Sequence, residues 1–253
     1  MQTPSIKIEN VSKRFGDCLA LKDLNLEIFR GEIFGLLGPN GAGKTTSIKL
    51  VTGLLKPTCG RILIEGIDVQ LDPLEAKKKF SLLPDVPYIY EKLTGWEFMK
   101  FITRIYRIDR SGIDDEINRQ LLIFNLREIA HDLIDSYSHG LRQRLLLASV
   151  ILRDPDIIIL DEPMVGLDPE AARMVKDIFK KLAGENKTIF LSTHTLTDAE
   201  ELCSRIAIIN RGKLSVCGTI DELREVARKK DAAAGEDSPG DLESIYLSIT
   251  KDA

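Results

Sequence analysis

Apolar residues occur along this chain either in short unbroken runs or in longer stretches with helical spacing. The unbroken runs have the length of buried strands, and each ends at a glycine, a proline or a polar residue. They predict strands over 32–37, 80–83, 157–160 and 188–192. The helical spacing predicts helices over 45–52, 94–105, 114–125, 138–152 and 170–182.

A different pattern, the alternation of single apolar and polar residues, marks half-exposed antiparallel strands. It occurs at 6–8 and 24–28, and a further strand is predicted at 61–64. Near the end of the chain, 206–216 reads as a hairpin that turns at an Arg-Gly pair.

The region 86–153 is mostly helical in character. A Thr-x-x-Glu pattern, in which the threonine caps the helix and the glutamate bonds back to the threonine, marks helix starts. It predicts one helix start at Thr94, within this region, and another at Thr197.

The residues between the first buried strand and the first helix fit G-x-x-x-x-G-K-[ST] at every fixed position. They are Gly38, Pro39, Asn40, Gly41, Ala42, Gly43, Lys44, Thr45 and Thr46. Small residues let successive backbone N–H groups converge on phosphate oxygens, and the following helix turns its partially positive end toward them. Lys44 adds a positive charge near the β- and γ-phosphates, the Thr45 hydroxyl suits Mg²⁺, and Thr46 offers another hydroxyl. The alternative is a flexible glycine turn in front of a helix.

Two carboxylates, Asp161 and Glu162, follow directly after the apolar run at 157–160. Buried parallel strands end in this way at a ligand crevice. Asp161 is suited to hold Mg²⁺ directly or through water, and Glu162 to orient and deprotonate a water that attacks the γ-phosphate. His194 follows the last buried strand and is a candidate for a phosphate contact. The alternatives are an acidic turn at a strand end and a solvated loop histidine.

Two weaker signals each admit two interpretations. Phe15 lies between the first two strands, where its ring either stacks on an adenine base or makes an ordinary core contact. Ser138, His139 and Gly140 open an apolar helix, and they form either a second anion site or an ordinary helix cap.

Composition narrows the class of protein. An apolar content of 43% with 29% charged residues is that of a globular protein, and a net charge of −4 gives no sign of a nucleic acid partner. The four cysteines are far apart and only three histidines are present, so we expect neither zinc nor a disulfide framework, and a reducing cytosol fits best. No apolar window approaches about 18 residues, and the N-terminal residues lack a signal-peptide pattern, so we expect the chain not to span a membrane.

These motifs, in this order and spacing, resemble the nucleotide-binding subunit of an ATP-binding cassette (ABC) transporter over residues 4 to about 225. The stretch 38–45 matches the Walker A motif and 157–161 the Walker B motif. Glu162 matches the catalytic glutamate of the family and His194 its switch histidine.

The same resemblance assigns roles to the weaker signals. Phe15 stands where the family has an adenine-stacking aromatic residue, and Asp168 stands in the loop that contacts the opposite subunit. The segment 137–144 is similar to the signature usually written L-S-G-G-Q, which reaches the γ-phosphate of the ATP held by the partner subunit. This chain keeps its serine and second glycine, Ser138 and Gly140.

The chain departs from the family pattern at four positions, three in the signature and one in the Q-loop. The signature has His139 and Leu141 in place of its usual glycine and glutamine, besides a tyrosine at its first position. Asp85 stands where the family has the Q-loop glutamine, so a carboxylate replaces the amide that contacts Mg²⁺ and the attacking water. Both departures resemble the exporter branch in which the ATPase and the membrane permease are separate chains.

By this resemblance the fold is α/β: a P-loop NTPase with a RecA-like core, an N-terminal antiparallel β layer and an inserted α-helical subdomain over about 86–153. The ATPase domain covers 1–227, and a flexible linker and a short C-terminal helix cover 228–253. ATP is the substrate and Mg²⁺ the cofactor.

The function implied by the resemblance is ATP hydrolysis that powers transport, in the direction of export, through an integral membrane permease. Two copies, or two related subunits, sandwich two ATP molecules between the Walker A motif of one and the signature of the other. The chain is expected in the cytoplasm, on the cytoplasmic face of the membrane through its permease. The segment 84–90 is the expected coupling groove.

Two other classes of function compete with this one. A soluble ABC ATPase that acts on ribosomes or DNA usually has two cassettes or a long coiled coil, and neither is present in this sequence. A P-loop phosphotransferase needs an acceptor pocket rather than a signature, and the segment 138–144 argues against it. The cargo and the choice between homodimer and heterodimer stay open.

Overall fold

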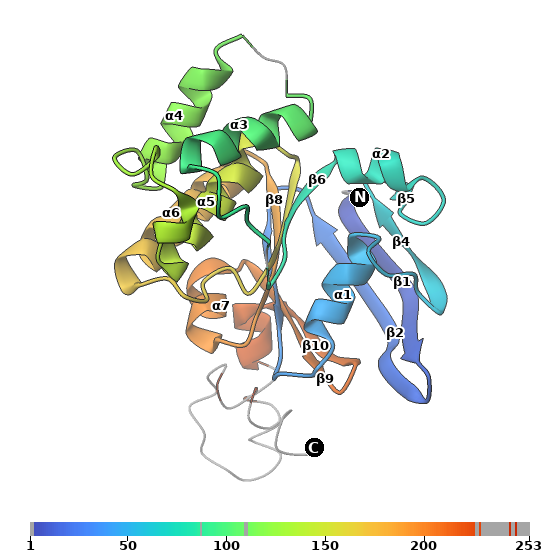
Figure 1. Cartoon of the computed structure of the whole chain (residues 1–253). Helices are drawn as coiled ribbons and strands as arrows, with labels where there is room; N and C mark the ends of the chain where they lie inside the picture. The colour runs from blue at the N-terminus through green and yellow to red at the C-terminus, as the bar shows by residue number, and fades with distance from the viewer. Residues whose placement is uncertain are drawn as a thin grey trace.

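The computed structural model describes residues 3–86, 88–108 and 111–225, together with 228, 243 and 246. These residues form two β-sheets and a group of helices (Figure 1). Apart from those last three positions, the linker and terminal helix predicted over 228–253 lie outside the described residues.

The larger sheet has six strands in the order β10-β9-β3-β8-β7-β6, and all of them except the edge strand β10 run parallel. They are β3 (Ile33–Leu37), β6 (Phe80–Leu83), β7 (Ile157–Asp161), β8 (Thr188–Thr193), β9 (Arg205–Asn210) and β10 (Lys213–Thr219). The unbroken apolar runs are therefore buried parallel strands, as their pattern predicts, and the hairpin near 211 is β9 with β10.

The smaller sheet is antiparallel, in the order β2-β1-β4-β5. Its strands are β1 (Pro4–Phe15), β2 (Cys18–Phe29), β4 (Cys59–Ile64) and β5 (Ile67–Asp68). The strand β4 begins two residues earlier than predicted, because its pairing with β1 continues across a register shift to Ser12 and Cys59. A Cβ at Gly60 would lie 2.4 Å from the carbonyl oxygen of Asn10, and its φ of +83° suits glycine.

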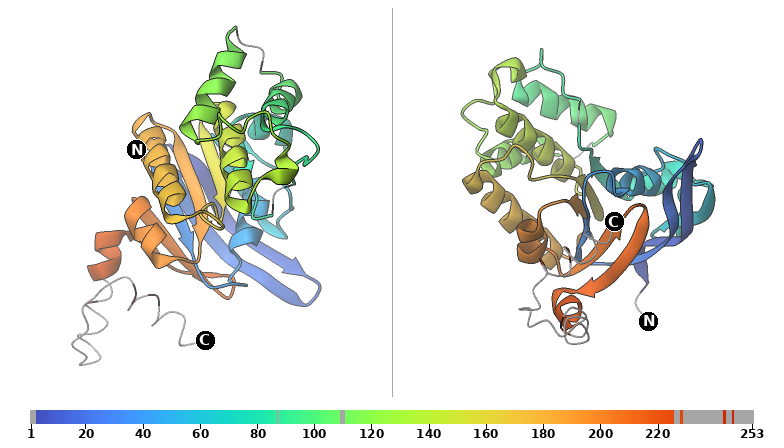
Figure 2. Two further views of the ribbon diagram at one scale, coloured as in Figure 1. Left: turned by 60° about the vertical axis from the view of Figure 1, so that its left-hand side comes forward. Right: turned by 90° about the horizontal axis from the view of Figure 1, so that it is seen from below.

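The helices lie mainly on one side of the larger sheet, and the smaller sheet lies on the other (Figures 1 and 2). They are α1 (Lys44–Val51), α2 (Pro73–Lys78), α3 (Gly95–Ile105), α4 (Ile113–Ile123), η1 (Ile134–Ser136), α5 (His139–Leu152), α6 (Pro169–Gly184) and α7 (Leu196–Leu202). Residues 220–225 are also helical. The capping box predicted at Thr94 and Glu97 is present at the start of α3.

The start of α7 corrects a prediction. The Thr-x-x-Glu pattern predicts a helix start at Thr197, but α7 begins at Leu196. Thr195 is the N-cap residue, and its side chain makes no capping hydrogen bond. The backbone N–H of Thr195 donates instead to Oγ1 of Thr193 at 3.0 Å. The chain thus turns into the helix directly from the end of β8, which places Thr197 inside the first turn.

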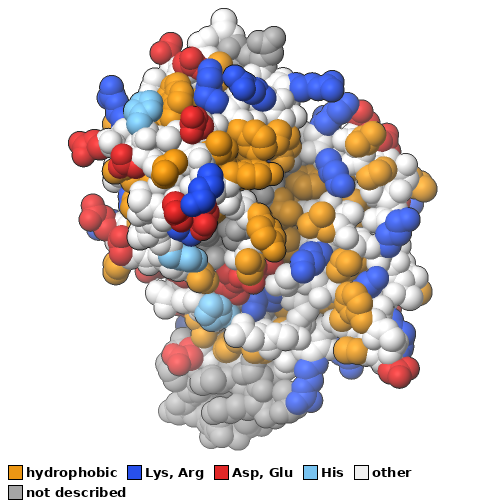
Figure 3. All heavy atoms as spheres, viewed as in Figure 1, with side chains coloured by type: hydrophobic (Ala, Val, Ile, Leu, Met, Phe, Trp, Pro, Cys, Tyr) orange, Lys and Arg blue, Asp and Glu red, His pale blue; other side chains and the backbone are white. Residues whose placement is uncertain are grey.

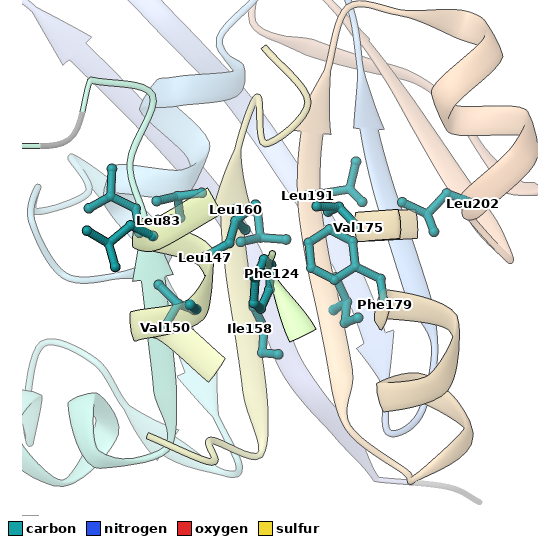
Figure 4. Close-up of a cluster of buried hydrophobic side chains, with 14 of the residues drawn as sticks. Leu83, Phe124, Leu147, Val150, Ile158, Leu160, Val175, Phe179, Leu191 and Leu202 are labelled. Atoms are coloured by element: carbon teal, nitrogen blue, oxygen red, sulfur yellow. The ribbon is translucent and has the colours of Figure 1, made fainter. Parts of the chain in front are cut away.

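Two hydrophobic clusters pack against the two faces of the larger sheet. Alternate side chains of β7 enter them: Ile157 and Ile159 join the cluster with the smaller sheet and α1, whereas Ile158 and Leu160 join the cluster with the helices. Figure 4 shows the second cluster, in which Phe179 of α6 packs on the sheet. Burial on both faces explains why β7 is apolar up to its last residue.

Candidate active site

The loop between β3 and α1 packs too closely for side chains at two of its glycines. A Cβ at Gly38 would lie 2.3 Å from the carbonyl oxygen of Ile209. Gly43 has φ +112°, and a Cβ there would lie 2.8 Å from the Leu21 side chain. Gly43 is also the N-cap of α1 and provides no side-chain cap. The positive end of α1 is therefore open toward an anion.

Lys44 is folded into this loop, with only 6% of its side chain exposed. Its Nζ donates to the carbonyl oxygen of Gly38 at 2.7 Å and to that of Pro39 at 3.3 Å. The same nitrogen lies 3.4 Å from Oε1 of Glu162. An ammonium group held here lies within reach of phosphates that rest on the loop.

Asp161 and Glu162 lie at the carboxyl end of β7. Burial raises the pKa of Asp161 above its ordinary value, whereas hydrogen bonds from the hydroxyls of Ser192 and Thr45 act in the opposite direction. Asp161 is 2% exposed, and Glu162 is more open and has a left-handed φ of +52°. The structure thus brings a carboxylate and the Thr45 hydroxyl together at the start of α1.

His194 lies at the end of the neighbouring strand β8. Its Nδ1 is 2.9 Å from Oε2 of Glu162, and its side chain is 49% exposed. Glu162 therefore contacts Lys44 with one carboxylate oxygen and His194 with the other. These three side chains come from three different elements and meet at one edge of the sheet.

A cleft of about 690 Å³ opens at this edge. It is lined by ten residues that the sequence predicts for the site: Pro39, Asn40, Gly41, Gly43, Lys44, Thr45, Thr46, Asp85, Glu162 and His194. Other lining residues come from β2 and from the turn between β9 and β10: Cys18, Leu19, Ala20, Arg211 and Gly212.

Asp85 borders a second cavity as well as this cleft. The second cavity, called the groove below, has a volume of about 890 Å³ and is lined by the segment after β6 and by α3 and α5. Its lining includes Tyr88, which is 96% exposed, and Tyr90, which is 59% exposed. Figure 3 shows hydrophobic side chains gathered in this part of the surface, with Lys and Arg around them.

The signature residues 138–141 lie outside the nucleotide cleft of their own chain. None of them is among the described residues that line it. Ser138 is the N-cap of α5, and its Oγ accepts a hydrogen bond from the N–H of Leu141 at 3.3 Å. The helix-cap interpretation of Ser138 is thus confirmed, and contact with a phosphate stays a prediction. His139 lines the groove beside Asp85.

The signature residues pack directly on the loop before α6. A Cβ at Gly166 would lie 1.9 Å from Nδ1 of His139, and a Cβ at Gly140 would lie 2.9 Å from the Gly166 carbonyl oxygen. Further along this loop, the Asp168 side chain caps α6 by accepting from the N–H of Ala171 at 2.8 Å. The signature and the Asp168 loop therefore form one continuous surface.

Phe15 is at the end of β1 and is 45% exposed. Lys13 Nζ lies 4.9 Å from the centre of its ring. The core-contact interpretation of Phe15 is wrong, because the ring stays at the surface, and stacking on a base remains the prediction.

Sequence reasoning missed two residues of this site. Ser192 contacts both Asp161 and Glu162, and its only sequence signal is a hydroxyl residue within an apolar strand. Arg211 lines the cleft from a hairpin that carries no motif. The hydrogen bonds of Ser192 and the position of Arg211 at the cleft both depend on segments far apart in the chain.

The residues at the cleft fit Mg²⁺. Asp161, Thr45 and Asp85 offer only oxygen atoms, which are the ligands Mg²⁺ prefers. The described part of the chain holds no group of three or more His, Cys, Asp or Glu residues that forms a metal site by itself.

A P-loop nucleotide-binding protein is defined by a glycine loop between a parallel strand and a helix, a buried lysine, and acidic residues at the end of another parallel strand of the same sheet. The profile of the ABC transporter family matches residues 21–165. The chain belongs to this family, in which ATP hydrolysis is the general activity of the domain.

Relatives and solved structures agree. The chain is 39% identical to ABC transporter ATP-binding protein all4389 of Nostoc over 81% of its length and 61% of that protein. It is 34% identical to the probable multidrug ABC transporter ATP-binding protein YbhF of Escherichia coli over 98% of its length and 42% of that protein. It is also 34% identical to the daunorubicin resistance protein DrrA3 of Streptomyces coeruleorubidus, over 88% of its length and 71% of DrrA3. The chain thus spans about three fifths of the length of all4389 and about two fifths of the length of YbhF.

Among solved structures, an ATP-binding subunit of an ABC transporter superposes with a TM-score of 0.86 at 27% identity, covering 96% of this chain and 98% of that one. A dimeric post-hydrolysis state of the cassette MJ0796, bound to ADP and Pi, gives 0.77 at 28% identity, covering 85% and 98%. In the described residues, no helix has both the length and the apolarity that a membrane span requires.

Proposed function

We propose that this chain hydrolyses ATP as the nucleotide-binding subunit of an ABC exporter, in which two such subunits drive a separate membrane permease. The observation that carries the proposal is the position of Glu162 between Lys44 and His194 at the mouth of the phosphate loop. This constellation suits the transfer of a γ-phosphoryl group to water.

Each residue of the site has a role in this proposal. The loop and Lys44 hold the phosphates, and Glu162 accepts the proton of the attacking water. His194 orients Glu162 and contacts the γ-phosphate. Phe15 stacks on the adenine ring, which its exposed position permits.

Asp161, Thr45 and Asp85 would hold Mg²⁺, each with oxygen. Bound with ATP, the ion neutralises charge on the β- and γ-phosphates. Asp161 is prepared for a cation because its burial makes an uncompensated negative charge costly.

The site is completed by a second subunit. The cleft lacks the signature residues of its own chain, and the family includes a cassette solved as a dimer with ADP and Pi. In a head-to-tail dimer, the N-terminus of α5 with Ser138 and Gly140 faces the γ-phosphate held by the partner. Asp168, on the same surface, contacts the opposite subunit.

The groove beside Asp85 is the proposed seat of the permease. It exposes Tyr88 and Tyr90 in a cavity large enough for a helix end, and it shares Asp85 with the nucleotide cleft. The chain then lies on the cytoplasmic face of the membrane, held there by the permease. The names of YbhF and DrrA3, a multidrug and a daunorubicin resistance protein, support export as the direction.

Affinity purification of the tagged chain from detergent-treated membranes, followed by mass spectrometry, tests this assignment. We expect an integral membrane permease to co-purify in stoichiometric amount. A Tyr88→Glu variant should no longer bind the permease, because a charge in the groove opposes an apolar contact. The control is Leu71→Glu, which places the same charge at an exposed apolar residue outside the groove (Leu71 is 85% exposed) and should retain the permease. Recovery of ribosomes or DNA in place of a permease would refute the assignment.

A further inference from the structure

Ser192 is a fully buried hydroxyl residue at the carboxyl end of β8. It lies directly opposite Asp161 in the parallel pairing of β7 with β8. Its neighbours along the sheet are thus the two carboxylates on which the proposed hydrolysis depends.

The Ser192 side chain contacts both residues of the acidic pair. Its Oγ donates a hydrogen bond to Oδ1 of Asp161 and accepts one from the backbone N–H of Glu162 at 3.2 Å. The same N–H lies 3.3 Å from the Ser192 carbonyl oxygen. The single proton and an acceptor site of the hydroxyl are therefore both in use.

These contacts fall where the backbone is strained. Glu162 has φ +52°, a left-handed conformation that a residue with a Cβ adopts only at a cost. Such a conformation persists when surrounding contacts hold it. The two acceptors of Ser192 hold the Glu162 N–H and thereby fix the direction in which its side chain leaves the strand.

We propose that Ser192 is a positioning residue for ATP hydrolysis. Its hydroxyl holds one oxygen of the Asp161 carboxylate, so that the other oxygen faces the metal position. The same hydroxyl holds the backbone N–H of Glu162, so that the Glu162 carboxylate lies between Lys44 and His194. This inference rests on the proposed catalytic function.

A second buried serine supplies a matched control. Ser81 of β6 also belongs to the larger sheet and is fully buried, but its Oγ has no hydrogen-bond partner among the described residues. Removing an unpaired buried hydroxyl is close to neutral. If burial alone determined the effect of a serine, Ser81→Ala and Ser192→Ala would behave alike.

The experiment compares purified Ser192→Ala, Ser81→Ala and unmodified protein. We expect Ser192→Ala to lower kcat by about 10- to 100-fold, the usual cost of removing a group that orients a metal ligand. ATP affinity without metal, measured by calorimetry in EDTA, should stay within about twofold because the phosphate loop is untouched. Mn²⁺ affinity of the ADP complex, measured by electron paramagnetic resonance, should fall about tenfold. Ser81→Ala should change none of these.

A second pair of variants separates the hydroxyl from crowding. Ser192→Thr and Ser192→Val add the same bulk to the buried position, but only threonine keeps a hydroxyl. We expect threonine to retain more turnover and tighter Mn²⁺ binding than valine. Equal values for the two would overturn the proposal.

Two other results would also overturn it: unchanged kcat and Mn²⁺ affinity in Ser192→Ala, or a parallel loss of metal-free ATP binding, which indicates general damage to the fold. Failure of the proposed function is a separate outcome. It shows as normal turnover in Glu162→Gln, while Mn²⁺ binding still reports on Ser192 and Asp161.

Discussion

The phosphate loop and the signature should serve the same ATP only when they come from different chains. Lys44→Ala removes the ammonium group of the phosphate loop. Ser138→Arg damages the signature by placing a bulky side chain at the N-terminus of α5. Because the cleft of one chain contains Lys44 but no residue of 138–141, the loop and the signature of one chain are expected to belong to the two different sites of a dimer. Each variant alone is therefore expected to be inactive, and a mixture of the two should regain activity.

The size of the recovery follows from counting sites. When equal amounts of the two variants pair at random, about half of the dimers contain one chain of each kind. In a mixed dimer, one site combines both defects and the other combines the intact loop with the intact signature. About one quarter of all sites are then intact, so the single-turnover amplitude should be about one quarter of that of the unmodified protein.

The assay is single-turnover cleavage of radiolabelled ATP, because steady-state cycling in which both sites participate would hide one intact site. Different affinity tags on the two variants allow mixed dimers to be purified and counted. Measurement in membranes as well as in solution allows for dimers that form only with the permease bound. If confirmed mixed dimers show no cleavage in either setting, the loop and the signature do not share a site across chains.

Four single substitutions give further expectations. Glu162→Gln should bind ATP normally and turn it over about 10²- to 10⁴-fold more slowly, as for loss of a general base. Lys44→Ala should weaken ATP binding about 10- to 100-fold by calorimetry, because charged hydrogen bonds are lost. Asp85→Gln should keep or raise hydrolysis, because it removes a negative charge beside the γ-phosphate. Gly166→Ala should lower the free energy of unfolding in urea by about 1 to 3 kcal/mol, because φ is +80° and the new Cβ would strike His139.

Each expectation has a contrary result. Near-normal steady-state turnover in Glu162→Gln would exclude its role as a base, and unchanged ATP affinity in Lys44→Ala would show that its charge is not used in binding. A tenfold drop in Asp85→Gln would show that the carboxylate itself is needed. For Gly166→Ala the matched control is Gly184→Ala, because a Cβ at Gly184 meets no atom within 4 Å. Equal unfolding energies for the two would contradict the packing argument.

The sequence predicts the five parallel strands of the larger sheet to within one residue at each end, because burial on both faces leaves few polar interruptions, whereas the edge strand β10 extends three residues beyond its predicted end. The run at 157–160 and the strand β7 differ by one residue. The smaller sheet is harder to predict. Its strand β1 extends over 12 residues, of which the alternation marks only 6–8, because shifts in the register with β2 interrupt the pattern.

Some residues of the site can be predicted from the sequence and others cannot. Lys44, Asp161 and Glu162 are predictable because each stands at a fixed distance from glycines or from an apolar run. The left-handed backbone of Glu162 and the hydrogen bonds of Ser192 are not, because they arise from pairing between strands separated by 30 residues in the chain. A single serine inside an apolar strand looks the same whether its hydroxyl is paired or, as in Ser81, unpaired.

The shared border at Asp85 has a thermodynamic consequence. One side chain lines both the nucleotide cleft and the groove, so an occupant of either cavity acts on the same carboxylate. Binding free energies in two such cavities are linked reciprocally: whatever factor ATP imposes on affinity in the groove, the groove's occupant imposes on affinity for ATP. For the permease proposed above, a substitution made only in the permease is therefore expected to change the ATP dissociation constant of this chain.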